Sequence, residues 1–145
     1  MEYKVKELTK NDLNNLESLF ETLSNLTKSP LQSKERTEEL LSHMNAQGSK
    51  IFVAITPEGE YIGSLTLLIE HKMTRGWVVA GHIEDVVTRK GFEGNGIASA
   101  LMKAAIEEAK KNSCYKIILD CDDELAWYYE KFWFKNDGTF MRAYL

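Results

Sequence analysis

The stretch that decides the fold is GHIEDVVTRKGFEGNGIASALM, residues 81–102. Residues 82–88 are rich in β-branched and apolar side chains, which are typical of a strand, and the residues from Gly96 onward have the Ala and Leu content of a helix. Gly91, Gly94 and Gly96 stand between the two. Glycine lets the backbone turn sharply and bring its N–H groups close to a ligand, and a helix N-terminus adds a positive dipole end. This geometry favours phosphate binding.

The glycine spacing by itself leaves alternatives open. A dinucleotide site needs the pattern G-x-G-x-x-G, which is not met because Gly94 and Gly96 are followed by Ser99. A tight turn that binds nothing explains the glycines as well as a phosphate site does. The loop chemistry therefore does not decide between phosphate binding and a plain turn.

The elements around this stretch follow from hydrophobic spacing and from helix-capping residues. Thr9 with Asp12, Ser33 and Gly48 are candidate caps. We expect helices over residues 9–27, 33–48, 96–112 and 123–132. We expect strands over 3–8, 50–56, 61–73, 77–88, 115–121 and 139–145, with 115–121 buried on both faces. The order predicts one α+β domain, residues 1–145, with a mixed, mostly antiparallel central sheet flanked by helices.

Composition narrows the function classes. The 145 residues are 43% hydrophobic, which suits one domain with a real core, and the net charge of −4 argues against non-specific nucleic-acid binding. No apolar run reaches membrane length and the charged N-terminus lacks a signal-peptide core, so we expect a cytoplasmic protein. Cys114 and Cys121 are expected to be free thiols, because a strand of ~3.3 Å per residue holds them too far apart for a disulfide.

The order of elements, together with EGNGIA at the helix entry, resembles the GNAT acetyltransferase superfamily. The pyrophosphate loop of that family has Arg or Gln, two variable residues, Gly, one variable residue, then Gly or Ala. Glu93, Gly96 and Ala98 stand at these positions. Within the superfamily, GHIEDVV, CYKIILDCD and YYEKFWF resemble the signatures of the glucosamine-6-phosphate N-acetyltransferases, in the same order and at the same spacing over about residues 70–141.

The resemblance implies an enzyme of amino-sugar metabolism with a GNAT fold, in which a splayed strand pair forms the acetyl-CoA cleft. Acetyl-CoA would donate its acetyl group directly to the 2-amino group of glucosamine 6-phosphate, without an acyl-enzyme and without a metal. The product would be N-acetylglucosamine 6-phosphate. The family also implies a homodimer, in which the last strand and neighbouring loops of one subunit complete the sugar-phosphate site of the other.

The resemblance also assigns residues to acetyl-CoA. The pantetheine arm would pair with the backbone of Val86, Val87 and Thr88. An arm rich in amides can lie along a splayed strand edge as an extra strand, and a main-chain N–H there can stabilise the oxyanion formed at the thioester carbonyl. The pyrophosphate would be held by Gly94, Asn95, Gly96, Ile97, Ala98 and Ser99.

Four further residues are candidates for the chemistry. Glu84, with its neighbour Asp85, would orient sugar hydroxyls and help to keep the amine unprotonated. Adjacent strand residues point to opposite faces, so one of the two faces the core or a cleft; a carboxylate at a sheet end or paired with a buried cation is the alternative. The resemblance places the main-chain carbonyl of Asp120 at the substrate amine, and the phenol of Tyr129 near the CoA sulfur, where it can protonate the leaving thiolate.

A sugar phosphate needs cations and hydroxyls, which an acidic protein must gather locally. The candidates are Ser24, Lys72, Arg75, Tyr115, Lys116 and Arg142. As isolated surface cations they would be uninformative, and Tyr115 could equally be a core aromatic. Arg142 would replace the family's C-terminal Arg, whose position two residues later holds Tyr144.

Three residues depart from the family pattern: Glu93 in place of Gln or Arg, Leu125 in place of Asn, and Trp133 in place of Gly. They leave two alternatives to the function above. One is a GNAT enzyme that acts on another small amine or a peptide amine. The other is a CoA-binding module without catalysis.

Overall fold

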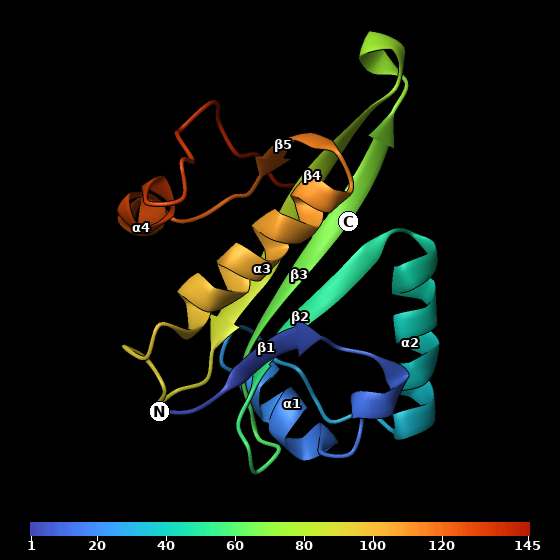
Figure 1. Cartoon of the computed structure of the whole chain (residues 1–145), viewed down its shortest axis with the longest axis vertical. Coiled ribbons are helices and arrows are strands. Elements are labelled where there is room, and N and C mark those ends of the chain that lie inside the picture. Colours follow the sequence, from blue (N-terminus) through green and yellow to red (C-terminus); the bar gives the residue numbers. More distant parts are fainter.

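The computed structural model describes all residues, Met1–Leu145, as a five-stranded sheet in the order β1-β2-β3-β4-β5. The first four strands pair as antiparallel neighbours, and the fifth pairs in parallel with the fourth (Figure 1). The strands are β1 (Lys4–Glu7), β2 (Ser49–Ile55), β3 (Tyr61–Lys72), β4 (Val78–Thr88) and β5 (Cys114–Ile118). The expectation of a mixed, mostly antiparallel sheet is confirmed.

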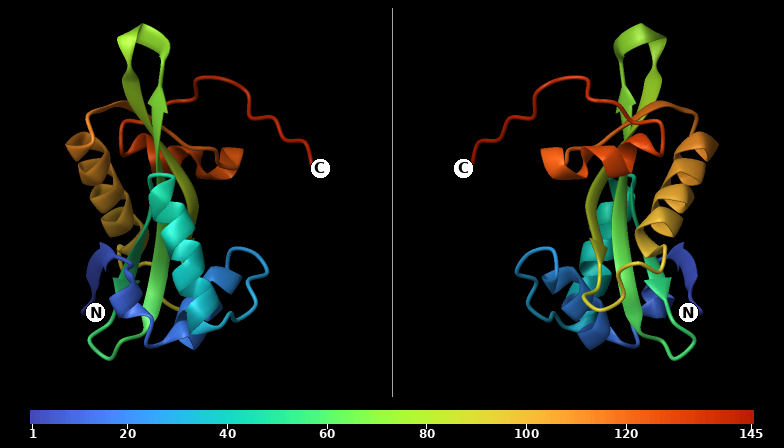
Figure 2. Two further views of the ribbon diagram at one scale, coloured as in Figure 1. Left: turned by 90° about the vertical axis from the view of Figure 1, so that its right-hand side faces the viewer. Right: turned by 90° about the vertical axis from the view of Figure 1, so that its left-hand side faces the viewer.

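Helices cover both faces of the sheet (Figure 2). One face carries α3 (Ile97–Lys111), and the other carries α1 (Leu16–Ser24) and α2 (Lys34–Ala46). Because side chains alternate along a strand, Leu65, Leu67 and Ile69 of β3 share one face and pack into the core under α3. A fourth, short helix, α4 (Ala126–Glu130), follows β5. No helix combines the length and the apolar character that crossing a membrane requires.

The helix caps expected at Ser33 and Gly48 are confirmed. The Ser33 side chain accepts the Arg36 N–H at the start of α2, and Gly48 has a φ of +83° just after its end. The helix expected over residues 9–27 is divided instead. Thr9 and Asp12 form a capping box on a single 3₁₀ turn, Lys10–Asp12, and α1 begins only at Leu16. The division is explained by Asn15, whose side chain caps α1 and also donates to the Gly59 carbonyl.

Two expectations for the C-terminal part are wrong. The strand expected over 115–121 ends at Ile118 and is not buried on both faces, because it lies at the edge of the sheet with β4 as its only neighbour. The strand expected over 139–145 is absent, since no strand in the chain pairs with this segment. Figure 2 shows the segment extending away from the body of the domain. Both cysteines are free, as expected.

The close packing of α3 on β3 depends on Gly63. A Cβ at this position would lie 2.5 Å from a methyl carbon of Ile97 and 3.1 Å from one of Leu101. Ile97 opens α3 directly after the glycine loop, so Gly63 sets the height of that loop above the sheet.

We predict that Gly63→Ala lowers the free energy of unfolding by about 1–3 kcal/mol, because the added methyl group overpacks the α3 interface. Urea unfolding followed by circular dichroism measures the change. Gly81→Ala is the matched control, since its Cβ would meet Ile117 and Leu67 at an ordinary 3.4 Å. Equal stability losses in the two variants would contradict the prediction.

Candidate active site

The cleft begins where β4 and β5 separate. Their ladder runs from Val79, which pairs with Cys114, to His82, which pairs with Ile118. Beyond His82 the strand β4 continues to Thr88, while the chain after β5 leaves the sheet (Figure 1). The edge of β4 from Ile83 to Thr88 therefore has no strand on this side. An unpaired edge of N–H and C=O groups can hydrogen-bond an extended ligand that carries amides.

A β-bulge interrupts β4 at the start of this free edge. Thr66 of β3 pairs with Glu84, but Ser64 pairs with Val87, so β4 has one extra residue at this point. Asp85 has a φ of +52°, in the left-handed region, a conformation that occurs in one class of bulge. The bulge breaks the strict alternation expected for Glu84 and Asp85, and both side chains are exposed, so neither faces the core.

Glu84, Asp120 and Tyr129 come together at the mouth of the splay, although they belong to β4, to the segment after β5 and to α4. The pKa of Glu84 is raised, chiefly by desolvation and then by the negative charges of Asp120 and Asp85, while His82 lowers it. Partial burial raises the pKa of the Tyr129 phenol, and Cys121, Tyr128 and Asp120 raise it further. Asp120 thus lies within electrostatic range of both Glu84 and Tyr129.

The glycine loop presents free main-chain donors. Gly94 and Gly96 have φ values of +80° and +75°, which glycine adopts without strain. The N–H groups of residues 93–96 donate to no acceptor in the protein, and the next three N–H groups belong to the first turn of α3, where a helix has no acceptor for them. Such a row of donors, at the positive end of a fifteen-residue helix, fits a pyrophosphate.

Glu93 is turned back onto its own loop. Its carboxylate Oε2 accepts the N–H of Gly91 at 2.7 Å, on the side of the loop that precedes the free donors. The Lys90 N–H donates to the Asn25 side chain at 2.5 Å, which ties the loop to the end of α1. A shallow hollow of about 320 Å³ lies between Asn25, Thr88, Lys90 and Glu93. The Glu93 charge is thus satisfied locally rather than aimed along the row of donors.

A cluster of cations surrounds Tyr115 at the edge of the sheet. The guanidinium carbon of Arg75 lies 5.1 Å from the centroid of the Tyr115 ring, and Nζ of Lys116 lies 5.3 Å from it. The hydrogen bond that Lys72 donates to Glu70 raises the pKa of Lys72, and the Tyr115 phenol adds a smaller contribution. Tyr115 is itself exposed, so it is not a core aromatic.

Ser24 and Arg142 do not join this cluster within one chain. The Ser24 hydroxyl, at the end of α1, donates to the Ser29 carbonyl, and α1 packs against Tyr61 at the start of β3. Lys72 ends the same strand, about 35 Å away at ~3.3 Å per residue. Arg142 lies in the exposed C-terminal segment, where it contacts the rings of Phe140 and Tyr144. Their assignment to the sugar-phosphate site stays a prediction.

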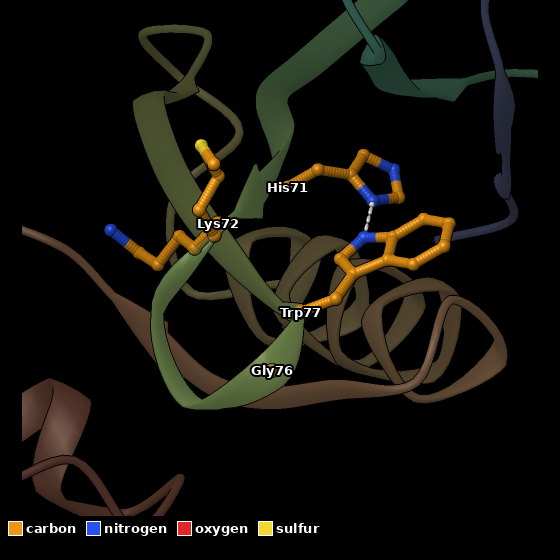
Figure 3. Close-up of a pocket in the computed structure, with 5 residues that line it drawn as sticks. His71, Lys72, Gly76 and Trp77 are labelled. Atoms are coloured by element: carbon orange, nitrogen blue, oxygen red, sulfur yellow. Dashed lines mark hydrogen bonds between the residues drawn. The ribbon is translucent and has the colours of Figure 1, made fainter.

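Two features of the site were missed from the sequence. The first is Glu70, whose carboxylate binds both Lys72 and His82. The sequence carried one signal for this contact: residues two apart on a strand share a face, so Glu70 lies beside Lys72, and His82 lies beside Glu84. The second is an open pocket of about 370 Å³ at the tip of the β3–β4 hairpin, where Trp77 Nε1 donates to His71 Nδ1 at 3.0 Å (Figure 3). No group of three or more His, Cys, Asp or Glu side chains is placed to hold a metal ion.

Comparison with known proteins places these features in a family. Residues 16–134 match the model of the acetyltransferase (GNAT) family. The glucosamine 6-phosphate N-acetyltransferase of Trypanosoma brucei brucei is 35% identical over 129 residues, 88% of this chain and 87% of that protein. The Candida albicans enzyme of the same name is 32% identical over 141 residues, 96% of this chain and 93% of that protein.

The fold agrees with the same relatives. The crystal structure of glucosamine-6-phosphate N-acetyltransferase from Arabidopsis thaliana superposes with a TM-score of 0.91 at 27% identity, over 99% of this chain and 99% of that chain. The family model spans most of the sheet and every helix that lines the cleft. The chain belongs to the acetyltransferase (GNAT) family, and its relatives within that family are named glucosamine 6-phosphate N-acetyltransferases.

Proposed function

We propose that this chain is an N-acetyltransferase that transfers the acetyl group of acetyl-CoA to the 2-amino group of glucosamine 6-phosphate. The product is N-acetylglucosamine 6-phosphate. The observation that supports a phosphorylated substrate is the cation cluster around Tyr115. The chain gathers these cations at one place although its net charge is −4. Lys116 pairs in register with Ala80, four residues from Glu84, so the cluster lies roughly 13 Å along the sheet from the proposed amine site. The names of the relatives support the same substrate.

The residues present fit acetyl-CoA. The free edge of β4 at Val86, Val87 and Thr88 would pair with the pantetheine amides, and the N–H groups of residues 94–99 would hold the pyrophosphate. When bound, acetyl-CoA supplies an acetyl group activated as a thioester. A second candidate, a CoA-binding module without catalysis, would share these contacts but would need no titratable groups at the mouth of the splay.

Glu84 and Tyr129 would perform opposite proton transfers. A protonated amine has no lone pair, so Glu84 accepts the proton that the substrate ammonium must lose before the amine attacks. The main-chain carbonyl of Asp120 would orient the amine, and Asp85 would orient sugar hydroxyls. The raised pKa of Tyr129 keeps its phenol protonated at neutral pH, so it has a proton to donate to the departing thiolate.

We also infer that two copies of the chain form the working enzyme. The C-terminal segment exposes Phe140, Met141, Tyr144 and Leu145, and β5 offers an unpaired edge. A strand edge and an apolar segment without partners favour pairing between chains. The pairing would carry Arg142 toward the sugar-phosphate site of the other subunit, which one chain alone does not complete.

We also propose a cytoplasmic location. Two free cysteines suit the reducing cytoplasm, and cell fractionation with the acetyl-transfer assay tests this location.

We predict that Lys72→Ala and Lys116→Ala each raise the KM for glucosamine 6-phosphate about tenfold, because each removes a charge-assisted contact to phosphate. The KM for acetyl-CoA should not change. Release of the CoA thiol, followed with glucosamine 6-phosphate and with unphosphorylated glucosamine, measures both constants. Lys110→Ala, on the exposed end of α3, is the control.

Each outcome of this assay has a meaning. An unchanged KM for glucosamine 6-phosphate in both lysine variants would point to another amine as the substrate. No thiol release with any amine would instead favour the binding module.

We predict that kcat falls at acidic pH with a midpoint above the ordinary Glu value, since the deprotonated form of Glu84 is the active one and its pKa is raised. Asp120→Asn keeps the main-chain carbonyl but removes one charge that raises this pKa, so the acid limb moves to lower pH. Asp123→Asn, whose charge does not act on Glu84, leaves the limb in place. Tyr129→Phe lowers kcat at every pH but leaves the midpoint of the acid limb unchanged. A limb that stays fixed in Asp120→Asn would rule out Glu84 as its origin.

We predict that removal of residues 139–145 converts a dimer into a monomer and raises the KM for glucosamine 6-phosphate, because the segment would bridge the two copies. Light scattering after gel filtration gives the mass. Arg142→Ala alone should raise the KM but keep the dimer. A full-length chain that is monomeric at assay concentration would refute the pairing.

A further inference from the structure

Two side chains, one from β3 and one from β4, converge on one carboxylate oxygen of Glu70. Nζ of Lys72 lies 2.8 Å from Oε1 of Glu70, and Nε2 of His82 lies 3.0 Å from the same atom. The strand register explains the convergence. Glu70 pairs with Ala80, so His82 is its diagonal neighbour, and Lys72 follows Glu70 by two residues on the same face. This face is the one opposite α3.

The carboxylate of Glu70 stays charged at neutral and mildly acidic pH. Hydrogen bonds from Lys72, and then from His82, lower its pKa to about 2. The His82 side chain is only 23% exposed, so the imidazole is held between the two strands rather than in free solvent. Glu70 therefore fixes the position of His82 through Nε2.

His82 is also the titratable neighbour of Glu84 on the same face of β4. The two residues are separated by one position, and the β-bulge begins only after Glu84, so their side chains leave the same face. The charge of His82 acts on Glu84. Lys72, Glu70 and His82 are thus linked by hydrogen bonds, and His82 shares a strand face with Glu84, the proposed proton acceptor.

The contact to Glu70 decides which imidazole nitrogen is free. A carboxylate only accepts, so Nε2 carries the hydrogen and the neutral ring keeps its lone pair on Nδ1. No protein group is hydrogen-bonded to Nδ1. The charged groups that face the ring are Glu70 and Lys72 from β3 and Glu84 from β4 itself, with Lys116 and Asp120 beyond on the side of β5.

We propose that Glu70 is a positioning residue, which holds His82 with Nδ1 free to pass the substrate's proton from Glu84 to solvent. The proposal rests on the proposed acetyl transfer. The N–H bond of the ammonium breaks, its electron pair stays on nitrogen, and the proton moves to a carboxylate oxygen of Glu84. That proton then moves to Nδ1 of His82, directly or through a water, and the resulting imidazolium is stabilised by Glu70 until Nδ1 releases the proton to water.

The shared oxygen adds a link to the substrate. A phosphate bound at the cation cluster attracts Lys72 away from Glu70. The Glu70 carboxylate then pairs with His82 alone and stabilises the imidazolium more strongly. Glu70 therefore makes the phosphate of the substrate contribute to kcat as well as to KM. This is a property that a purely structural ion pair would not have.

The test compares Glu70→Gln and His82→Ala with the wild type. Glu70→Gln keeps an oxygen for Nε2 but loses the charge, so we expect kcat to fall about tenfold, and His82→Ala to lower it about a hundredfold. Acetyl-CoA affinity should not change, which also shows that the variants are folded. Glu107→Gln and His71→Ala are matched controls. Figure 3 shows that His71 and Lys72 leave β3 in opposite directions.

Two readouts separate the relay from a structural role. Imidazoles added to the buffer should restore kcat to His82→Ala, more strongly as their basicity rises. In the wild type, glucosamine 6-phosphate should have a higher kcat than glucosamine, and Glu70→Gln should reduce this ratio toward one.

An unchanged kcat in Glu70→Gln, or an absence of imidazole rescue in His82→Ala, would overturn the proposal while leaving the acetyl transfer intact. A wild-type chain that does not acetylate glucosamine 6-phosphate would overturn both.

Discussion

The structure depends on the end of hydrogen bonding between β4 and β5 after His82. Main-chain N–H and C=O groups are obligatory hydrogen-bonding groups, so an edge left unpaired in the middle of a domain needs either water or a ligand with matching amides. The bulge at Asp85 maintains the opening, because an extra residue on β4 increases the local twist. The glycine loop follows on the same strand, so the cleft and the anion site are positioned by one continuous segment of backbone.

Much of the fold was predictable because its signals are local. Capping residues such as Ser33 and Gly48 act within one turn, and the glycines of the loop report a backbone conformation that only they adopt easily. The bulge was not predictable, since it depends on the register between β3 and β4. The burial of residues 115–121 was also misjudged, because a run of apolar residues does not distinguish a central strand from an edge strand. The C-terminal segment belongs to the same class of error, because its residues suit a strand but no strand of the chain pairs with it.

The candidate site shows the same division between local and long-range information. Glu84, Asp120 and Tyr129 were expected as separate positions, and their mutual electrostatic influence emerges only when β4, the segment after β5 and α4 are assembled. Lys72 was expected to bind the sugar phosphate, and in the structure it is paired with Glu70. A phosphate that binds there must compete with a carboxylate, which costs affinity and in return makes the pocket selective for a ligand that carries two charges.

The three departures from the family pattern support a silent binding module less than their number suggests. Glu93 hydrogen-bonds Gly91, so its charge is partly neutralised by a main-chain donor. Trp133 has a φ of +72°, so the turn keeps the left-handed geometry that a glycine would adopt, at a cost of about 1–2 kcal/mol. Its ring is 96% exposed, so no packing inside the chain compensates for this strain. A strained, exposed Trp is explained if the ring becomes buried between the two copies proposed above. On that view Trp133 belongs to the assembly of the enzyme and not to a loss of its chemistry.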